Sequence, residues 1–379
     1  MPDRDRHILC INGGSSSIKY ASFDLARPAR RVLSGSFERI GVSGGLSFRA
    51  ATGELLEQVA QHIDLRSLAA VAHRVVHGGP RFETHRRIDD EVLAELRQLQ
   101  PFDPQHLPGE IALIDELRAH VPRVPQFACF DTAFHAGLPR VARLLPIPRR
   151  FEARGVRRYG FHGLSYAWLM QELARLDPDG ARGRVVLAHL GNGASLAAVR
   201  DGQSIDTTMA FTPAAGIPMS TRSGDLDPGL AGYLAQIDGL RAAQFHHLVN
   251  FESGLLGVSE TSSDVRDLLG REAGDIRAAE ALALFCYEVR KRIGALAAAL
   301  GGLDTLVFSG GVGEHQPMLR ARMCTGLAFL GIELDPTANE SGAPVISSTR
   351  ARVTARVIPT DEERMMADVV ARLLAQENP

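Results

Sequence analysis

HILCINGGSSSIKYASFDL, residues 7–25, is the stretch that decides the fold. An apolar run, a turn of glycine and serine, and a second run with alternating side chains predict two strands joined by a tight turn. Residues 185–200, VVLAHLGNGASLAAVR, repeat this pattern. Gly13 and Gly191 stand 178 residues apart in a chain of 379 residues. A repeat with that period predicts two related domains, each opening with a glycine-rich β-turn.

Helical patterns fill the spaces between the strand patterns. The apolar spacing predicts helices over residues 89–100, 109–120, 275–300 and 362–376. Residues 303–314 predict a buried strand followed by a glycine turn, and residues 351–360 predict a further strand. Strands and helices alternate along the chain, so the fold class is α/β. A chain of 379 residues also suits two domains of roughly 190 residues each.

Composition and charge exclude several classes of protein. The chain is 45% hydrophobic and 23% charged with a net charge of −2, as in globular proteins, and gives no reason to expect nucleic acid or a membrane as a partner. The run Ile8–Ile11 is too short for a signal-peptide core, and Ile293–Leu303 is about half of a bilayer span. The four cysteines are scattered without metal-finger spacing. We therefore expect buried thiols and a cytoplasmic location.

Lysine is rare in this chain. Lys19 and Lys291 are the only lysines among 42 basic Lys and Arg residues. A GC-rich genome is the plain explanation for the excess of arginine. A lysine that persists in such a chain can also serve as a compact ammonium, which Arg cannot replace.

Glycine turns beside strands suit phosphate, because they present backbone N–H groups at close approach. Residues 12–19, NGGSSSIK, offer such N–H groups with three hydroxyls and one ammonium. No GxxxxGK[ST] motif occurs, and GNGASL (191–196) and GVGEHQ (311–316) lack the last glycine of the GxGxxG pattern. The phosphate would thus lie over a β-hairpin. A plain hairpin turn is the structural alternative.

Ten segments together resemble those of the acetate and propionate kinase family, in the family's order and over nearly the whole chain. They are INGGSSSIKY (11–20), HRVVHGG (73–79), FDTAFH (130–135), RRYGFHGLS (157–165), HLGNGAS (189–195), STRSGDLDPG (220–229), GLLGVS (254–259), SSDVRD (262–267), FSGGVGE (308–314) and PTDEE (359–363). The resemblance implies duplicated actin-like, ribonuclease H-like domains flanking a nucleotide cleft. It implies an N-terminal domain of residues 1–132 completed by a C-terminal helix, 363–379, and a second, nucleotide-binding domain, 133–362.

The resemblance also implies an activity. It implies an enzyme, a magnesium-dependent transferase that reversibly passes the γ-phosphoryl group of ATP in line to acetate, giving acetyl phosphate and ADP, and that forms a homodimer. Mg²⁺ is the implied cofactor, with Mn²⁺ as a substitute. A propionate or other short-chain carboxylate kinase is the nearest alternative. An actin- or chaperone-like ATPase is the alternative from another class, although it would lack the carboxylate site.

The catalytic residues that the resemblance implies are of types that suit their implied roles. Arg74 resembles the family's carboxylate-binding arginine, since a guanidinium fork can hold a carboxylate by two bonds. Arg222 and His162 resemble the family's stabilisers of the moving phosphoryl group. Val76 and Pro213 resemble walls of its acyl pocket. The structural alternative is that the arginines form ordinary surface ion pairs.

Asp131 resembles the family's active-site aspartate. A carboxylate substrate with a pKa near about 4.3 is already ionised at neutral pH, so there is no proton for a base to remove. We therefore expect Asp131 to orient Arg74 or Arg222, or to hold magnesium through water.

The resemblance implies a nucleotide site and a metal site. The implied nucleotide contacts are Lys19, His189, Leu190, Gly191, Asn192, Gly193, Asp264, Val265, Arg266, Gly310, Gly311, Val312, Gly313 and Glu314. His189 could instead be a hydrogen-bonded core histidine. The implied metal ligands are Asn12 and Glu362. Thr360 with Glu363 also fits a helix capping box, which keeps a structural reading of that segment open.

Three departures from the family pattern bear on the acyl pocket, on the loop of Arg222 and on the implied metal. Gln105 stands where the family has a leucine in its acyl pocket, so an amide would face a methyl group. Ala214 and Ala215 replace a Leu-Glu pair, and Ser220 replaces a glycine, in the loop that carries Arg222. Asp361 replaces an asparagine and adds a negative charge beside the implied metal.

Overall fold

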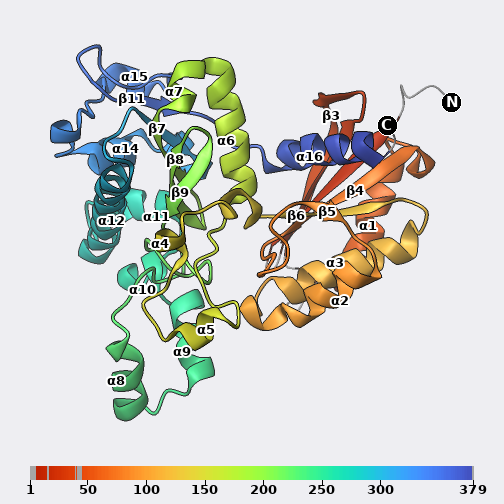
Figure 1. Cartoon of the computed structure of the whole chain (residues 1–379). Coiled ribbons are helices and arrows are strands. Elements are labelled where there is room, and N and C mark those ends of the chain that lie inside the picture. Colours follow the sequence, from red (N-terminus) through yellow and green to blue (C-terminus); the bar gives the residue numbers. More distant parts are fainter. Residues whose placement is uncertain (1–5, 15–16, 39, 41–44, 378–379) are drawn as a thin grey trace. The chain divides into compact units, whose positions relative to one another are not determined.

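The computed structural model describes residues 6–14, 17–38, 40 and 45–377. Within these residues the chain divides into two compact units, one of residues 6–136, 163–168 and 361–377 and one of residues 137–162 and 169–360. Each unit is built on one mixed β-sheet (Figure 1). Ser15 and Ser16 of the predicted phosphate turn lie outside the described residues.

The sheet of the first unit has the strand order β3-β2-β1-β4-β6-β5. Its strands are β1 (His7–Gly13), β2 (Ser17–Asp24), β3 (Arg27–Glu38), β4 (Leu68–Val75), β5 (Arg86–Arg87) and β6 (Gln126–Phe130). β1, β2 and β3 pair antiparallel, whereas β1, β4 and β6 run parallel. The carboxyl ends of β1, β4 and β6 therefore meet at one edge of the sheet.

Helices cover both faces of this sheet. They are α1 (Phe48–Ala60), α2 (Asp90–Gln98), α3 (Leu107–His120) and α16 (Glu362–Glu377). Leu9 and Ile11 of β1 pack in one cluster with residues of α1 and α3, while Ile8 and Cys10 pack in another with residues of α16. Successive strand residues point to opposite faces, so one strand serves two cores.

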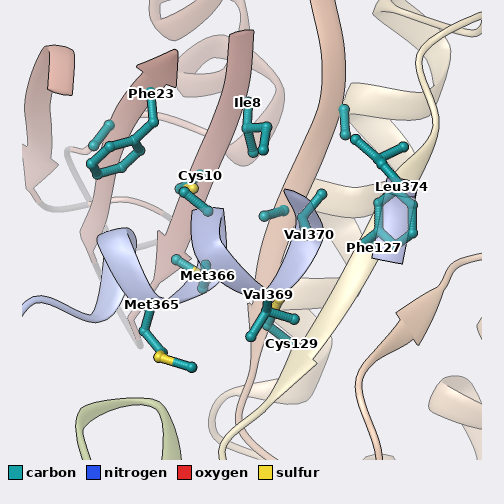
Figure 2. Close-up of a cluster of buried hydrophobic side chains, with 14 of the residues drawn as sticks. Ile8, Cys10, Phe23, Phe127, Cys129, Met365, Met366, Val369, Val370 and Leu374 are labelled. Atoms are coloured by element: carbon teal, nitrogen blue, oxygen red, sulfur yellow. The ribbon is translucent and has the colours of Figure 1, made fainter. Parts of the chain in front are cut away.

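α16 comes from the far end of the sequence and completes the core of the first unit. Figure 2 shows its side chains directed at the sheet, and Met366 and Val370 are fully buried against it. Full burial of such a side chain contributes about 1.5–3 kcal/mol. A charged residue in place of Val370 would therefore separate the helix from its sheet.

The sheet of the second unit has the order β11-β10-β7-β8-β9. Its strands are β7 (Arg184–Leu190), β8 (Ala194–Arg200), β9 (Gln203–Thr207), β10 (Thr305–Ser309) and β11 (Thr354–Val357). Its helices are α4 (Arg140–Arg143), α5 (Arg149–Glu152), α7 (Pro178–Arg182), α8 (Gly229–Ile237), α9 (Ala242–Phe251), α10 (Gly254–Ser259), α11 (Val265–Arg271), α12 (Ile276–Leu300), α13 (Gly310–His315), α14 (Pro317–Cys324) and α15 (Pro336–Glu340). The last eight residues of α6 (Gly163–Leu176) also belong to this unit, and its first six belong to the first unit.

The two sheets share the same topology over five strands, and only β5, which pairs antiparallel with β6, has no counterpart in the second sheet. In each sheet, a hairpin and the next strand along the chain form three antiparallel strands. Two further strands then extend the sheet in parallel from the first strand of the hairpin, β4 and β6 in one unit and β10 and β11 in the other. The hairpins β1–β2 and β7–β8 contain the two glycine turns, at Gly13 and Gly191. The predictions of an α/β fold and of two related domains are confirmed.

Several local expectations are adjusted by the structure. Asp275 is the N-cap of α12, and its side chain accepts a hydrogen bond from the Arg277 N–H. The glycines after β10 form the first turn of α13 and not a turn alone. The capping box of Thr360 with Glu363 is wrong, because Asp361 accepts from the Arg364 N–H at 3.0 Å as the cap of α16.

All four cysteines are buried and free, as expected from the sequence. In the described part of the chain, no helix has both the length and the apolar character that a membrane span requires.

Candidate active site

Polar residues converge at the edge of the first unit's sheet where β1, β4 and β6 end. Asn12 and Arg74 are near the ends of β1 and β4, and Asp131 directly follows β6. Glu362 and Glu363 open α16. We call these five residues the Arg74 cluster. The topology of the parallel strands brings them together although they span 351 positions of the sequence.

Arg74 and Asp131 form a buried ion pair. Arg74 donates to Oδ2 of Asp131 from Nη2 at 2.6 Å and from Nε at 3.1 Å. Asp131 is fully buried, while 15% of the Arg74 side chain is exposed. Burial disfavours the charged guanidinium, but the charges of Asp131 and Glu362 outweigh it and raise the pKa of Arg74. Arg74 is thus a permanently charged group held in one orientation.

A close approach of backbone fixes the position of Asp131. Its N–H donates to the Val75 carbonyl oxygen at 3.0 Å. A Cβ at Gly163 would lie 2.0 Å from the Asp131 carbonyl oxygen. Only glycine fits at position 163, the last residue of the YGFHG segment, because the backbone of Asp131 lies directly against it.

Oxygen-bearing side chains surround Asn12. Its amide nitrogen donates to Glu362 at 3.0 Å and to Glu363 at 3.1 Å, and its amide oxygen accepts from Arg74 Nη1 at 3.3 Å. Carboxylate and amide oxygens are the hard donors that Mg²⁺ takes, usually with several waters. The donor set at Asn12 and Glu362 therefore fits magnesium. No cluster of three or more His, Cys, Asp or Glu with metal-site geometry occurs among the described residues.

Val76 follows β4, and its N–H is held by a carboxylate that the sequence analysis did not single out. Glu110 of α3 accepts this N–H at 3.1 and 3.3 Å through its two oxygens. Both residues are buried. Burial raises the pKa of Glu110 well above its usual value, although Arg74 and the Val76 N–H oppose the shift.

Lys19 is exposed on β2, where it pairs with Asn12 across the hairpin. Cross-strand neighbours project from the same face of a sheet, so Lys19 and Asn12 share a face. The predicted contact of Lys19 with phosphate is compatible with this exposure and stays a prediction.

In the second unit, His162 is fixed by an imidazole and a hydroxyl. It has a left-handed backbone with φ of 59° at the start of α6. Its ring stacks on His189 with 4.3 Å between ring centroids, and its Nδ1 lies 2.8 Å from Ser195 Oγ. These contacts leave the Nε2 edge of His162 directed at Gly193, where a Cβ would lie 3.1 Å away. We call His162, His189, Gly193, Ser195 and Arg222 the His162 cluster.

Arg222 joins this cluster from the loop between β9 and α8. Its Nη1 would lie 3.5 Å from a Cβ at Gly193, and it donates to the Pro213 carbonyl oxygen at 3.3 Å. Ser220, which departs from the family pattern, donates its N–H to the Asn192 carbonyl oxygen at 3.2 Å. The loop is therefore tied to the second glycine turn despite its altered sequence.

The predicted nucleotide-binding segments lie partly against this turn. A Cβ at Gly310 would lie 2.7 Å from the Leu190 carbonyl oxygen, which places the start of α13 beside the end of β7. Glu314 uses its carboxylate to accept the N–H groups of Gly310 at 2.8 Å and Thr360 at 3.1 Å. Asp264 caps α11 and pairs with Arg266 at 2.6 Å.

The remaining predicted residues are distributed as follows. Gly191, Asn192 and Gly193 form the turn between β7 and β8; Gly311, Val312 and Gly313 lie in α13; Val265 is buried at the start of α11; Pro213 is buried in the loop before Arg222. Gln105 lies before α3, half-buried, and its amide nitrogen has no hydrogen-bond partner among the described residues.

The sequence analysis gave no site role to three residues that belong to the two clusters or lie beside them. Glu363 was considered only for capping, although it borders Asn12. Ser195 lies in the HLGNGAS segment but was given no role. Glu110 is a charge on the buried face of a helix whose neighbours Leu113 and Ile114 are core residues. A carboxylate in that position is a signal that could have been found.

Comparisons with known proteins agree with this arrangement. Residues 47–368 match the model of the Acetokinase family. The acetate kinase of Methylocella silvestris is 42% identical, with 98% of each chain covered, and so is the propionate kinase of Citrobacter rodentium. The structure of Porphyromonas gingivalis acetate kinase matches with a TM-score of 0.88 and 35% identity, over 97% of this chain and 100% of that one. A propionate kinase from Francisella tularensis matches with a TM-score of 0.91 and 32% identity, over 96% and 98%. This chain is therefore a member of the acetokinase family and a phosphotransferase with a carboxylate acceptor.

Proposed function

We propose that the protein is a magnesium-dependent acetate kinase that transfers the γ-phosphoryl group of ATP to acetate, reversibly and in line. The observation that carries the proposal is Arg74, a guanidinium whose orientation is set by a fully buried aspartate. A fork held in this way can bind a carboxylate by two bonds and fix which oxygen attacks.

In this proposal each unit contributes one part of the chemistry. Arg74 and Val76 of the first unit bind the acceptor, and Asp131 orients Arg74. In the second unit, Arg222 and His162 hydrogen-bond the equatorial oxygens of the moving phosphoryl group, while the glycine turn and α13 bind the nucleotide with Asp264–Arg266. Phosphoryl transfer needs positioning and charge neutralisation more than covalent chemistry, which these residue types supply.

Magnesium, or manganese in its place, would be held by Asn12 and Glu362. When bound it would neutralise charge on the phosphates, a function for which a hard divalent cation is suited. Lys19 would add a point charge at the terminal phosphates.

The assembly and location are also proposed. α8 has no buried residue, and Tyr233 and Ile237 on it are 60% and 61% exposed. A second copy of the chain would cover this apolar surface, so we propose a homodimer, which sedimentation of the full chain tests. Use of ATP and four buried free thiols support a cytoplasmic enzyme.

The test is a hydroxamate-trapping assay of the full chain with ATP, magnesium and a series of straight-chain carboxylates from formate to butyrate. We expect acyl phosphate from acetate. Formation of no acyl phosphate from any of the acids would overturn the proposal, and a propionate optimum would move it to the nearest alternative.

Gln105 decides between acetate and propionate in this proposal. A polar amide against the acyl group loses apolar contact of about 1 kcal/mol. Replacing Gln105 with Leu should therefore raise the ratio of propionate to acetate kcat/KM by about fivefold. An unchanged ratio would mean that Gln105 does not face the acyl group. Gln98→Leu, at the end of α2, is the control.

A further inference from the structure

Arg320 of α14 is a charged side chain buried in the second unit, with only 1% of the residue exposed. Its guanidinium donates four hydrogen bonds, all to neutral oxygens. Nε and Nη2 donate to the side-chain and carbonyl oxygens of Asn339 at 2.8 and 2.7 Å. Nη1 donates to the carbonyl oxygens of Gly313 at 2.8 Å and Glu314 at 2.9 Å. A buried charge is costly unless it is well bonded, so these bonds indicate a specific role.

The two carbonyl groups that Nη1 binds belong to the last turn of α13. The last carbonyl groups of a helix have no partner within it, and an arginine at that end satisfies them and offsets the partial negative charge of the helix end. Arg320 therefore caps α13 from the helix that follows it. Gly313 and Glu314 are among the residues implied in nucleotide binding, so the cap acts on that segment.

Asn339 ties this cap to a third helix. It lies in α15 and is 5% exposed. Its amide oxygen accepts from Arg320, and its amide nitrogen donates to the carbonyl oxygen of Pro317, the first residue of α14, at 2.8 Å. Arg320 and Asn339 thus join α13, α14 and α15 in one buried network. A shift of α13 would break bonds in this network, which is costly where water cannot replace them.

The start of α13 is held separately, and its middle is open. Gly310 has a φ of 75° and lies against Leu190, and its N–H donates to the Glu314 carboxylate at 2.8 Å. A Cβ at Gly311, by contrast, would have no heavy atom of the described residues within 4 Å. The Gly311 nitrogen would lie 4.0 Å from a Cβ at Gly191. α13 is therefore fixed at both ends and accessible at Gly311, beside the second glycine turn.

We propose that Arg320 is a positioning residue for the nucleotide, which holds α13 in the conformation that receives an adenine nucleotide at Gly311. The inference rests on the proposed function, in which α13 and the glycine turn bind ATP. Binding to a segment that is already ordered loses less conformational entropy than binding to one that must first be ordered. Arg320 is buried and acts through α13, so it should affect the affinity for nucleotide and not the transfer of the phosphoryl group.

The experiment compares the full-length wild type with Arg320→Lys. Lys keeps the charge, but its single ammonium cannot replace a planar fork that holds Asn339 and two carbonyl groups of α13. We expect the Kd for ADP, measured by calorimetry, and the KM for ATP to rise by about tenfold. kcat and the KM for acetate should stay within about twofold of the wild type. An unchanged Kd for ADP, or a fall in kcat at an unchanged KM for ATP, would overturn the inference.

Arg322→Lys, on the same helix, is the matched control. Arg322 makes a two-bond pair with Glu272 at 2.6 and 2.9 Å, so this variant also loses a guanidinium fork, yet it should bind ADP like the wild type. Asn339→Ala leaves Arg320 in place but removes one of its acceptors, and should raise the Kd for ADP by about threefold. A wild type that phosphorylates no carboxylate would overturn the proposed function, whereas the comparison of ADP binding still decides the inference.

A second measurement does not depend on any variant. Hydrogen exchange of the backbone N–H groups of residues 314–316 is followed in the wild type with and without ADP. The Gln316 N–H donates to the Val312 carbonyl oxygen at 3.1 Å within this helical turn. If the network holds α13, these groups should exchange slowly without ADP, and ADP should slow them by less than about threefold. Fast exchange that becomes slow only with ADP would overturn the inference.

Discussion

The Arg74 cluster and the His162 cluster differ in how they hold their charges. In the first, an arginine is locked by a buried aspartate and two further glutamates lie around Asn12. In the second, a stacked imidazole and a serine hydroxyl hold His162, and the glycine turn at Gly193 lies against both His162 and Arg222. On the proposed function, the first region binds an anion whose charge is constant, and the second binds a group whose charge moves. A fixed ion pair suits the former, and groups that can donate as charge develops suit the latter.

Arg222→Ala should have the largest effect of the substitutions that test this contrast. Because Arg222 would act on the moving phosphoryl group, kcat should fall by about 10²–10³-fold while the KM for acetate changes little. Steady-state kinetics with the hydroxamate assay measures both. Arg241→Ala, an exposed arginine of the same unit, is the control. A rise in the KM for acetate with full kcat would mean that Arg222 binds the acceptor, and the proposed difference between the two clusters would be wrong.

Arg74→Lys should have the opposite pattern, with a large change in KM and a small change in kcat. The charge beside Asp131 is kept, but the two-bond fork is lost, so the KM for acetate should rise by about 30-fold with a smaller change in kcat. Arg66→Lys, at an exposed pair with Asp64, is the control and should leave both constants unchanged. A fall in kcat alone would show that Arg74 acts in the transition state and not on the acceptor.

Asp131→Asn separates an orienting role from proton abstraction. Asn can still accept a bond from Arg74 but no longer holds its guanidinium by charge, so kcat should fall by about tenfold. The shape of the pH profile of kcat should stay that of the wild type, because no proton is removed. Asp115→Asn, at an exposed pair with Arg97, is the control. Full turnover with unchanged magnesium dependence would show that Asp131 has neither proposed role.

Lys19→Arg should have the smallest effect. Arg keeps the charge but spreads it over a larger group, so the KM for ATP should rise by about threefold. The second lysine supplies the matched control, since Lys291 pairs with Glu288 on the exposed side of α12. If Lys19→Arg and Lys291→Arg behave alike, the retention of Lys19 needs no functional explanation.

Much of the fold could be predicted because it rests on local patterns. The hairpins around Gly13 and Gly191 and the alternation of strands and helices are encoded in neighbouring residues, and both predictions were confirmed. The predicted boundary of α16 is also near the observed one, but the capping box of Thr360 with Glu363, which the sequence left open, is not formed because Asp361 is the cap. A shift of one residue at a helix start is common where several polar residues adjoin.

The candidate site was harder, because it depends on contacts between distant segments. Sequence motifs singled out Arg74 and Asp131 but left open whether Asp131 orients Arg74 or Arg222 or holds magnesium, and the structure shows it paired with Arg74 at 2.6 Å. Glu110 stands out in the sequence only as a carboxylate on an apolar helix face, and its partner, a backbone N–H, could not be predicted from that position. Ser195 was missed because its contact with His162 arises from strand β8 passing the start of α6.

The position of α16 at the end of the sequence determines when the core of the first unit can be completed during synthesis. Residues 6–136 emerge from the ribosome early, yet one face of their sheet packs against residues 362–377, together with Leu164 at the start of α6. At a synthesis rate of roughly 5–20 residues per second, about 10–45 s pass between residues 137 and 361. During that interval the strand residues Ile8, Cys10 and Phe127 lack their helical partner. The nascent first unit therefore lacks part of its core until α16 is made, and Glu362 reaches Asn12 only when translation is nearly finished.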